Sequence, residues 1–433
     1  MTYRFDMFSG VLGAVLMLFL SACDRSTDVA APVLGGDGEL KAEAFCDVQG
    51  LKPSLRHTYL LIDESIITKT ETPADFVIHN VAIRDAVLAL ADPVRAISSG
   101  AADFRERVSI IVMRKDGSGG GRVFTGCVPA LSPEEQQQIR SESSAVSDFF
   151  SGGVAQKLQN EVADFQGRLV GSLQLAARQA PGPASPQTGE FADTALIKSL
   201  RASGRLINSD AGVPRLVLIT NLGGVHFPPM MKREEARKAG FELGKTIGLD
   251  FGRADVLVIQ PSGGEDLHRE FMDAFLLAQH GGLAYWGDYR VGALAAAPVS
   301  VSRYAGDAAY PKGPETLQIR IGIDRNGKLV NSWVLLKGRP DRSTPMTGNA
   351  VCGQDGRCEI RSDQGGFAQA WSLAPGGEPE FDPEAPFGGM RDFQLISDRE
   401  RVTGRVFDAA ISQIGDAGDS IAIKAAAQPD ARF

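Results

Sequence analysis

HTYLLID, at residues 57–63, decides the fold, because Tyr, Leu, Leu and Ile follow one another without a charged break and the run ends in an acid. A strand that is apolar along most of its length is buried on both faces, as the strands of parallel sheets are. Four further runs share this texture: RVSIIVM at 107–113, RVFTGC at 122–127, RLVLIT at 215–220 and ADVLVIQ at 254–260. Helical segments separate the runs, and we predict an α/β domain over residues 44–300 with a doubly wound, mostly parallel sheet.

Helix signals lie between these strands. The stretch Ser132-Pro133-Glu134-Glu135 combines an N-cap serine, a proline at the first helical position and a glutamate that closes a capping box. It predicts a helical insertion over about residues 132–180, interrupted near residues 151–153. Amphipathic patterns predict two more helices, at residues 232–247 and 267–280.

The texture changes after residue 311. Residues 316–323 alternate polar and apolar side chains, and Asn326-Gly327 then turns the chain into a second run at 329–336. Asn-Gly between two such runs is typical of a hairpin. Further short strands are predicted at residues 358–361, 367–373, 393–396, 402–407 and 420–425. We therefore predict a β-rich, sandwich-like domain over residues 311–433.

The N-terminus has the features of an export signal. A charged end with Arg4 precedes an apolar run at residues 11–20 that is too short to span a bilayer, and Leu-Ser-Ala-Cys23 follows. This ending resembles the bacterial lipobox, which implies a signal peptide at 1–22 and acyl chains such as palmitate on Cys23. A flexible tether over residues 23–43 would then hold the protein on the cell membrane or the outer membrane, on its periplasmic or extracellular side. The alternative is a plain secretory signal followed by a free or buried cysteine.

The other four cysteines fit an oxidising compartment. They are an even number, and they predict two disulfides. Three pairings are possible, and we favour a short turn-rich loop closed by Cys352 and Cys358, which leaves Cys46 with Cys127. A metal site of four cysteines is disfavoured because no Cys-x2-Cys pair occurs.

Composition excludes some classes of function. The chain has 433 residues, a net charge of -8 and no cluster of Lys and Arg, so we expect no nucleic-acid binding. None of the five histidines lies in a His-Glu-x-x-His pattern or beside a Gly-x-Ser-x-Gly elbow. Residues 239–246 fit a loosened phosphate-loop pattern, but they lie where a helix is predicted, so we treat the match as chance.

Polar residues follow the first and fourth strands. Asp63 and Ser65 come at the end of the first strand, where open α/β sheets bind ligands. Asp63 and Ser65, together with Thr194 in a loop before a predicted helix and Asn221 after strand 215–220, resemble the metal-ion-dependent adhesion site of the von Willebrand factor type A (vWA) domain. The resemblance covers roughly residues 55–290. It implies a vWA-like fold and a Mg²⁺ ion that captures an acidic residue of a partner.

The resemblance is incomplete at two positions. Ile67 stands where the family has a second serine, and Asn221 stands where it has a carboxylate, so the site offers fewer oxygens and less charge than Mg²⁺ usually requires. Asp193 or Glu64 would restore a carboxylate. The alternative is that Asp63 and Ser65 simply cap the following segment.

Two functions from different classes follow. The first is a lipid-anchored, non-catalytic module whose sheet edge and β-rich domain bind another envelope protein, with or without Mg²⁺. The second is a metal-dependent envelope hydrolase that uses Asp63, Asp193 and a residue of the 261–266 loop. A hydrolase needs enough metal ligands and a base beside an open coordination position, and the sequence offers too few, so the binding module is our main hypothesis.

Overall fold

A computed structural model describes a defined part of the chain, all of it within one compact unit at residues 41–433. The described residues are 46, 54–63, 105–113, 120–130, 132, 134, 154–179, 195–207, 213–220, 222, 227–259, 266–288, 297–310, 313–336, 339–367, 371–373, 379–381, 391–408 and 420–428. No helix among these residues is long and apolar enough to cross a bilayer.

A six-stranded sheet forms the first part of the fold, in the order β3-β2-β1-β4-β5-β6. Its strands are β1 (Arg56–Asp63), β2 (Arg107–Met113), β3 (Gly120–Cys127), β4 (Val213–Ile219), β5 (Ala254–Ile259) and β6 (Gly281–Gly287). All neighbouring strands are parallel except β2 and β3, which are antiparallel. The predicted mostly parallel α/β sheet is therefore confirmed, and the strand order reverses direction between β1 and β4.

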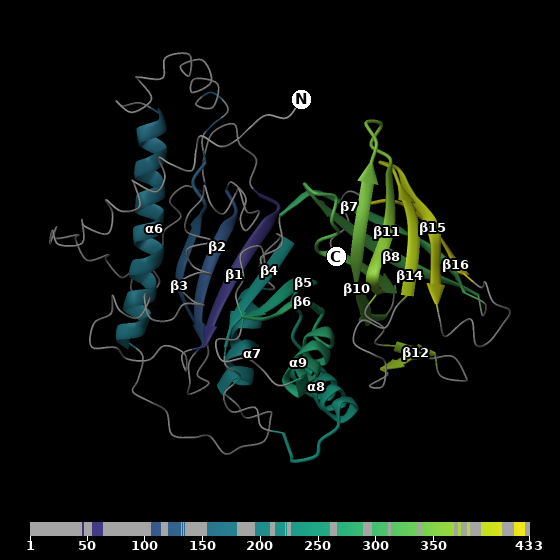
Figure 1. The fold of residues 1–433 in the computed structure, drawn as a ribbon, viewed down its shortest axis with the longest axis horizontal. Coiled ribbons are helices and arrows are strands. Elements are labelled where there is room, and N and C mark those ends of the chain that lie inside the picture. The colour runs from purple at the N-terminus through teal and green to yellow at the C-terminus, as the bar shows by residue number, and fades with distance from the viewer. Residues whose placement is uncertain are drawn as a thin grey trace. The chain divides into compact units, whose positions relative to one another are not determined.

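Helices cover both faces of this sheet (Figure 1). They are α6 (Val154–Gln179), α7 (Ala195–Ile207), α8 (Arg233–Ile247) and α9 (Asp266–Leu277). Phe165 of α6 makes an edge-to-face contact with Phe124 of β3, with ring centroids 5.7 Å apart, on one face. Residues from α7, α8 and α9 share a core on the other face with Tyr59 and Leu61 of β1. Successive β1 residues face opposite layers, which explains why the central residues of the strand, Tyr59 to Ile62, are apolar without interruption.

Helices α8 and α9 are packed closely because the chain has glycine where they meet. A Cβ atom added at Gly240 would lie 2.2 Å from the carbonyl oxygen of Phe271. Both helices were predicted from their amphipathic patterns. Of the predicted insertion at 132–180, the structure describes α6, the helical residue Glu134 and Ser132, and the remainder lies outside the described residues.

The C-terminal strands form a closed barrel, so the predicted sandwich is wrong. The barrel order is β10-β11-β14-β15-β16-β7-β8-β9, and every pair is antiparallel. The strands are β7 (Pro298–Tyr310), β8 (Gly313–Asp324), β9 (Ser332–Leu336), β10 (Arg339–Cys352), β11 (Cys358–Phe367), β14 (Arg391–Ser397), β15 (Arg401–Asp408) and β16 (Ser420–Ala427). A separate hairpin pairs β12 (Trp371–Leu373) with β13 (Pro379–Phe381).

Two long strands that the sequence did not reveal make the closure possible. β7 links β16 to β8, and β10 links β9 to β11. β7 begins before residue 311, where we expected the β-rich domain to start. Both strands place small or flexible side chains in the barrel core, including Ala308, Met346 and Ala350. Bulky alternating residues do not continue along the full length of either strand, and such alternation is what marks a half-buried strand in a sequence.

Both predicted disulfides are present. Cys46 and Cys127 join the segment before β1 to the end of β3, across 81 positions of sequence. Cys352 and Cys358 face each other as register partners at the turn between β10 and β11.

Candidate functional site

The carboxyl edge of the sheet has a buried polar pair where β1 and β4 lie side by side. Asp63 ends β1 and is 7% exposed, and Thr220, directly after β4, is fully buried. The Thr220 hydroxyl donates to Asp63 Oδ2 at 2.8 Å, and the backbone N–H of Leu222 donates to the Thr220 hydroxyl at 2.9 Å. Ligands of open α/β sheets bind at this reversal of strand order. Asp63 therefore lies at the expected position, with one carboxylate oxygen bonded to a fixed hydroxyl.

The remaining predicted metal ligands cannot be placed beside this pair. Ser65, Thr194 and Asn221 lie outside the described residues, as do Glu64 and Asp193. Within the described ranges, no group of three His, Cys, Asp or Glu side chains could hold a metal ion. Thr220 was not among the residues we selected from the sequence, although its position after a buried strand was a signal that could have identified it.

The opposite, amino edge of the sheet holds a buried ionic cluster. Glu106 is fully buried, and it accepts hydrogen bonds from Arg56 Nε at 3.1 Å, from Arg56 Nη2 at 2.9 Å and from Arg215 Nη2 at 3.0 Å. Thr58 also donates its hydroxyl to Glu106. Burial alone would raise the pKa of Glu106, but the Arg56 and Arg215 guanidinium groups outweigh it and hold that pKa below its usual value. The carboxylate is thus kept charged inside the protein.

The same edge is bonded to the barrel. Arg320 of β8 donates to the carbonyl oxygens of Asn331 at 2.8 Å and of Arg253 at 2.7 Å. Asn331 donates its backbone N–H to Asp255 Oδ2 at 2.9 Å and its side-chain amide to the carbonyl of Pro214 at 3.1 Å. Burial lowers the pKa of Arg320 to about 9 and raises the pKa of Asp255. Each of these bonds satisfies a buried polar group, so the amino edge has a structural role.

A second buried cluster joins α8 to α9. Arg237 Nη1 lies 3.0 Å from Glu270 Oε2 and 3.2 Å from Asp273 Oδ2. Burial raises the pKa of Asp273 to about 6, Arg237 partly offsets this increase, and Glu270 adds to it. Arg237 thus forms ion pairs with two acids, and one of them, Asp273, takes up a proton at mildly acidic pH.

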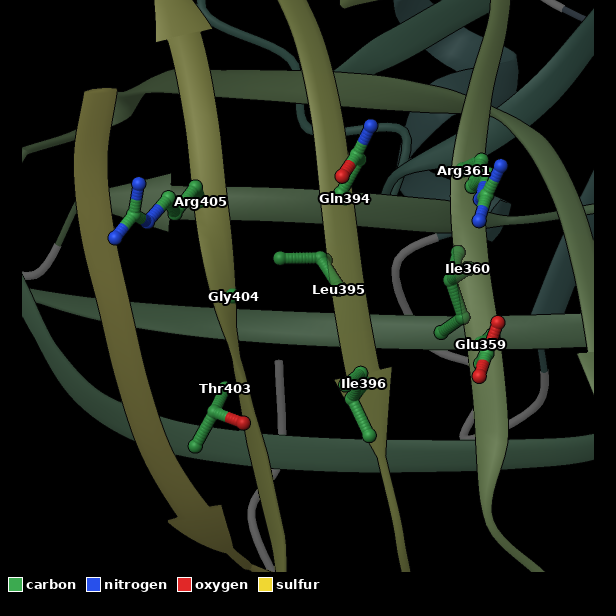
Figure 2. A pocket seen from close by; sticks show the side chains of 9 residues that line it. All are labelled: Glu359, Ile360, Arg361, Gln394, Leu395, Ile396, Thr403, Gly404 and Arg405. Atoms are coloured by element: carbon green, nitrogen blue, oxygen red, sulfur yellow. The ribbon is translucent and has the colours of Figure 1, made fainter. Parts of the chain in front are cut away.

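The outer surface of the barrel has a shallow hollow of about 250 Å³ across β11, β14 and β15 (Figure 2). Its lining residues lie in three cross-strand rows, which the register pairs define: Arg361-Gln394-Arg405, Ile360-Leu395-Gly404 and Glu359-Ile396-Thr403. The middle row consists of two side chains that face the barrel core and one glycine. The outer rows point outward, so the hollow lies above the glycine and the backbone of the middle row.

The first row is basic. Figure 2 shows Arg361 and Arg405 on either side of Gln394, and all three side chains are exposed. Within the part of the chain that the structure describes, neither guanidinium forms an ion pair. Our sequence analysis placed these residues on predicted strands but did not bring them together, because strand adjacency is not visible in local periodicity.

Comparison with known proteins finds a distant structural similarity. No family model and no curated protein matches the chain. Among solved structures it is similar to a protein described as von Willebrand factor type A from Catenulispora acidiphila, at 14% sequence identity and a TM-score of 0.28. The similarity covers 72% of this chain and 64%, less than two thirds, of that chain. At this level it supports no statement about function. The mixed, mostly parallel sheet is itself consistent with a vWA-like fold.

Proposed function

We propose that the protein is a lipid-anchored, non-catalytic module of the bacterial cell envelope that binds another envelope protein. The observation that carries this proposal is the basic row Arg361-Gln394-Arg405 at the barrel hollow. Two exposed guanidinium groups, on strands β11 and β15 with β14 between them, form a basic surface on a chain whose net charge is -8. This local positive charge is opposite in sign to the rest of the chain, so it favours an acidic ligand.

The spacing of the row suggests the kind of ligand. Arg361 lies on β11 and Arg405 on β15, with β14 between them. Because neighbouring strands are about 4.8 Å apart, their Cα atoms are separated by about 10 Å. An extended segment advances about 3.3 Å per residue and alternate side chains share a face, so two carboxylates about two or four residues apart would reach both arginines through their flexible side chains. Arginine binds carboxylates through two parallel hydrogen bonds, and the amide of Gln394 can pair with the backbone of the ligand between them.

Crosslinking in cells tests the proposal. A photo-reactive amino acid at position 394, on β14, should capture one envelope protein. The same amino acid at the exposed position 328, between β8 and β9, should not capture it. Affinity for the captured protein should then fall at least about tenfold in Arg361→Gln/Arg405→Gln, because each lost charge-assisted hydrogen bond contributes over 1 kcal/mol. The matched control Lys328→Gln should bind normally. Equal crosslinking at both positions, or equal affinity of the double variant, would refute the proposal.

The anchor has a separate test. Labelled palmitate should be incorporated into the wild-type chain and not into Cys23→Ser, and the variant should leave the membrane fraction. Incorporation into Cys23→Ser would contradict lipidation at this residue.

A further inference from the structure

A tight turn between β4 and α8 shows an unusual choice of residue. The backbone N–H of Met231 donates to the carbonyl of Pro228 at 3.1 Å, which closes a four-residue turn with Pro229 and Met230 at its centre. Met230 has φ of 71°. Proline at the second position and a positive φ at the third define a type II turn, in which the third position favours glycine or asparagine. Methionine at this position is strained, because its Cβ crowds the backbone.

Met230 gains little from packing against the described residues. The Met230 side chain is 96% exposed, the highest value among the exposed large apolar residues of the described chain. Glycine would fit the turn better and would expose no apolar surface. The turn therefore displays an apolar side chain at a cost to the folded state, and strain of this kind marks candidate functional positions.

The turn is held firmly at its base. The Phe227 ring makes edge-to-face contacts with Phe271 and His268, with centroids 5.8 Å and 4.8 Å away. Met231, on the other side, is partly buried against the core of the α/β layer. Pro229 also restricts the backbone. Met230 is consequently presented in a fixed direction.

Positive charge follows at once. Lys232 and Arg233 are both exposed and lead into α8, and Arg233 shares Glu270 with Arg237. The cap of α8 uses the backbone N–H of Lys232, which donates to Glu235 at 2.9 Å, so the Lys232 side chain is not needed for the helix start. The turn follows β4 in the chain and leads directly into α8, which is drawn in teal in Figure 1.

We propose that the turn at residues 228–231 docks on an anionic phospholipid surface. Met230 and the prolines enter the boundary between headgroups and acyl chains, and Lys232 meets the lipid phosphates. An apolar tip followed by an exposed cation matches the two layers of such a surface, since apolar side chains gain from burial and a basic residue is attracted by the headgroup charge. The inference is independent of the binding function proposed for the barrel.

Oxidation of Met230 by hydrogen peroxide, measured by mass spectrometry, reports its burial directly. The full chain is mixed with vesicles of phosphatidylglycerol and phosphatidylcholine, or of phosphatidylcholine alone. The apolar N-terminal run and Arg4 are present in both mixtures, and the oxidation rate is read at Met230 itself, so it reports the burial of the turn rather than binding through the N-terminus. We expect oxidation to be at least roughly fivefold slower with the anionic vesicles, because one basic residue near such a surface contributes about this factor. Equal rates with the two kinds of vesicle would overturn the proposal.

Variants separate the turn from other basic surfaces. Lys232→Gln should reduce the headgroup dependence, while Lys245→Gln, which removes an exposed cation from the far end of the same helix, should preserve it. Met230→Gly should raise the melting temperature by relieving the strain and should also weaken the headgroup-dependent sedimentation of the chain with anionic vesicles. A headgroup dependence that persists in Lys232→Gln but not in Lys245→Gln would likewise overturn the proposal.

Discussion

Replacing Glu106 by glutamine should destabilise the protein strongly. Glutamine has almost the same size, but it removes the carboxylate that bonds both Arg56 and Arg215. The glutamine amide would also turn an N–H₂ group toward donors that need an acceptor. Two guanidinium groups, on side chains only 1% exposed, would then remain inside the protein without this counter-ion.

The size of the effect follows from the geometry. At the observed separations of 2.9 Å and 3.0 Å, each ion pair has a gross Coulomb energy of about 5.6 kcal/mol at an effective dielectric constant of about 20. Most of this energy offsets the cost of removing the charges from water. Removing one partner of a buried pair costs about 3–5 kcal/mol, and we expect about 4 kcal/mol. Domains are typically stable by about 5–15 kcal/mol, so the loss is a large share of the total.

The loss should depend on pH in one direction. The pKa of Glu106 is lowered in the folded protein from an ordinary value of 4.5, so its stabilising effect is complete above pH 4.5 and is lost as the pH falls through the lower, folded pKa. Wild type and Glu106→Gln should therefore differ most near pH 7 and become more similar in strong acid.

Urea denaturation followed by far-UV circular dichroism would measure the free energy of unfolding across this pH range. Glu242→Gln, which changes an exposed glutamate on α8, is the matched control and should change the stability by less than about 0.5 kcal/mol. A loss below about 1 kcal/mol in Glu106→Gln, or a loss that does not shrink in acid, would refute our account of the cluster.

Three further outcomes are expected. Because burial raises the pKa of Asp273 to about 6 from 3.8, the folded state holds a proton that the unfolded state has released, and this contribution falls by up to about 3 kcal/mol as the pH rises from about 4 to about 6. Asp273→Asn should flatten the pH dependence of the free energy of unfolding between about pH 4 and about pH 6. If urea denaturation of the variant shows the same pH dependence as the wild type, the prediction is wrong. Gly171→Ala, which has open space around it, should stabilise the protein by ~0.5–1 kcal/mol because alanine favours the helix. Gly240→Ala should instead destabilise the protein by several times that amount, because the added Cβ would meet the backbone of α9. Thermal melting of the two variants would measure both effects. Calorimetric titration with Mg²⁺ should show only weak binding, since Asp63 already bonds Thr220; tight binding that Asp63→Ala abolishes would instead establish the metal site.

Local patterns were sufficient for the α/β part of the fold. The runs at 57–63, 107–113 and 254–260 coincide with β1, β2 and β5, because each strand is buried on both faces and carries its signal in consecutive residues. β6 was missed, since Gly281–Gly287 contains three glycines and lacks the run of consecutive apolar residues that marks the other strands. Both disulfides were also predicted, from cysteine number and from the turn-rich loop that ends at Cys358.

The candidate sites were harder to predict. Asp63 was found because an acid ends a strand that is otherwise apolar, but its bonding partner Thr220 lies 157 positions away. The barrel row was missed although its members were placed on predicted strands. Alternation tells which side chains share a face of one strand, and it does not tell which strands are neighbours.

The sequence by itself determined which segments are buried strands and which are amphipathic helices, because hydrophobic periodicity is a property of consecutive residues. Only the tertiary structure decided that β7 and β10 close a barrel, that Glu106 meets Arg56 and Arg215 from 50 and 109 positions away, and that Arg361 and Arg405 flank one hollow. These are pairings between distant segments, set by register and by the need to satisfy every buried polar group together, and no local window of sequence contains both partners.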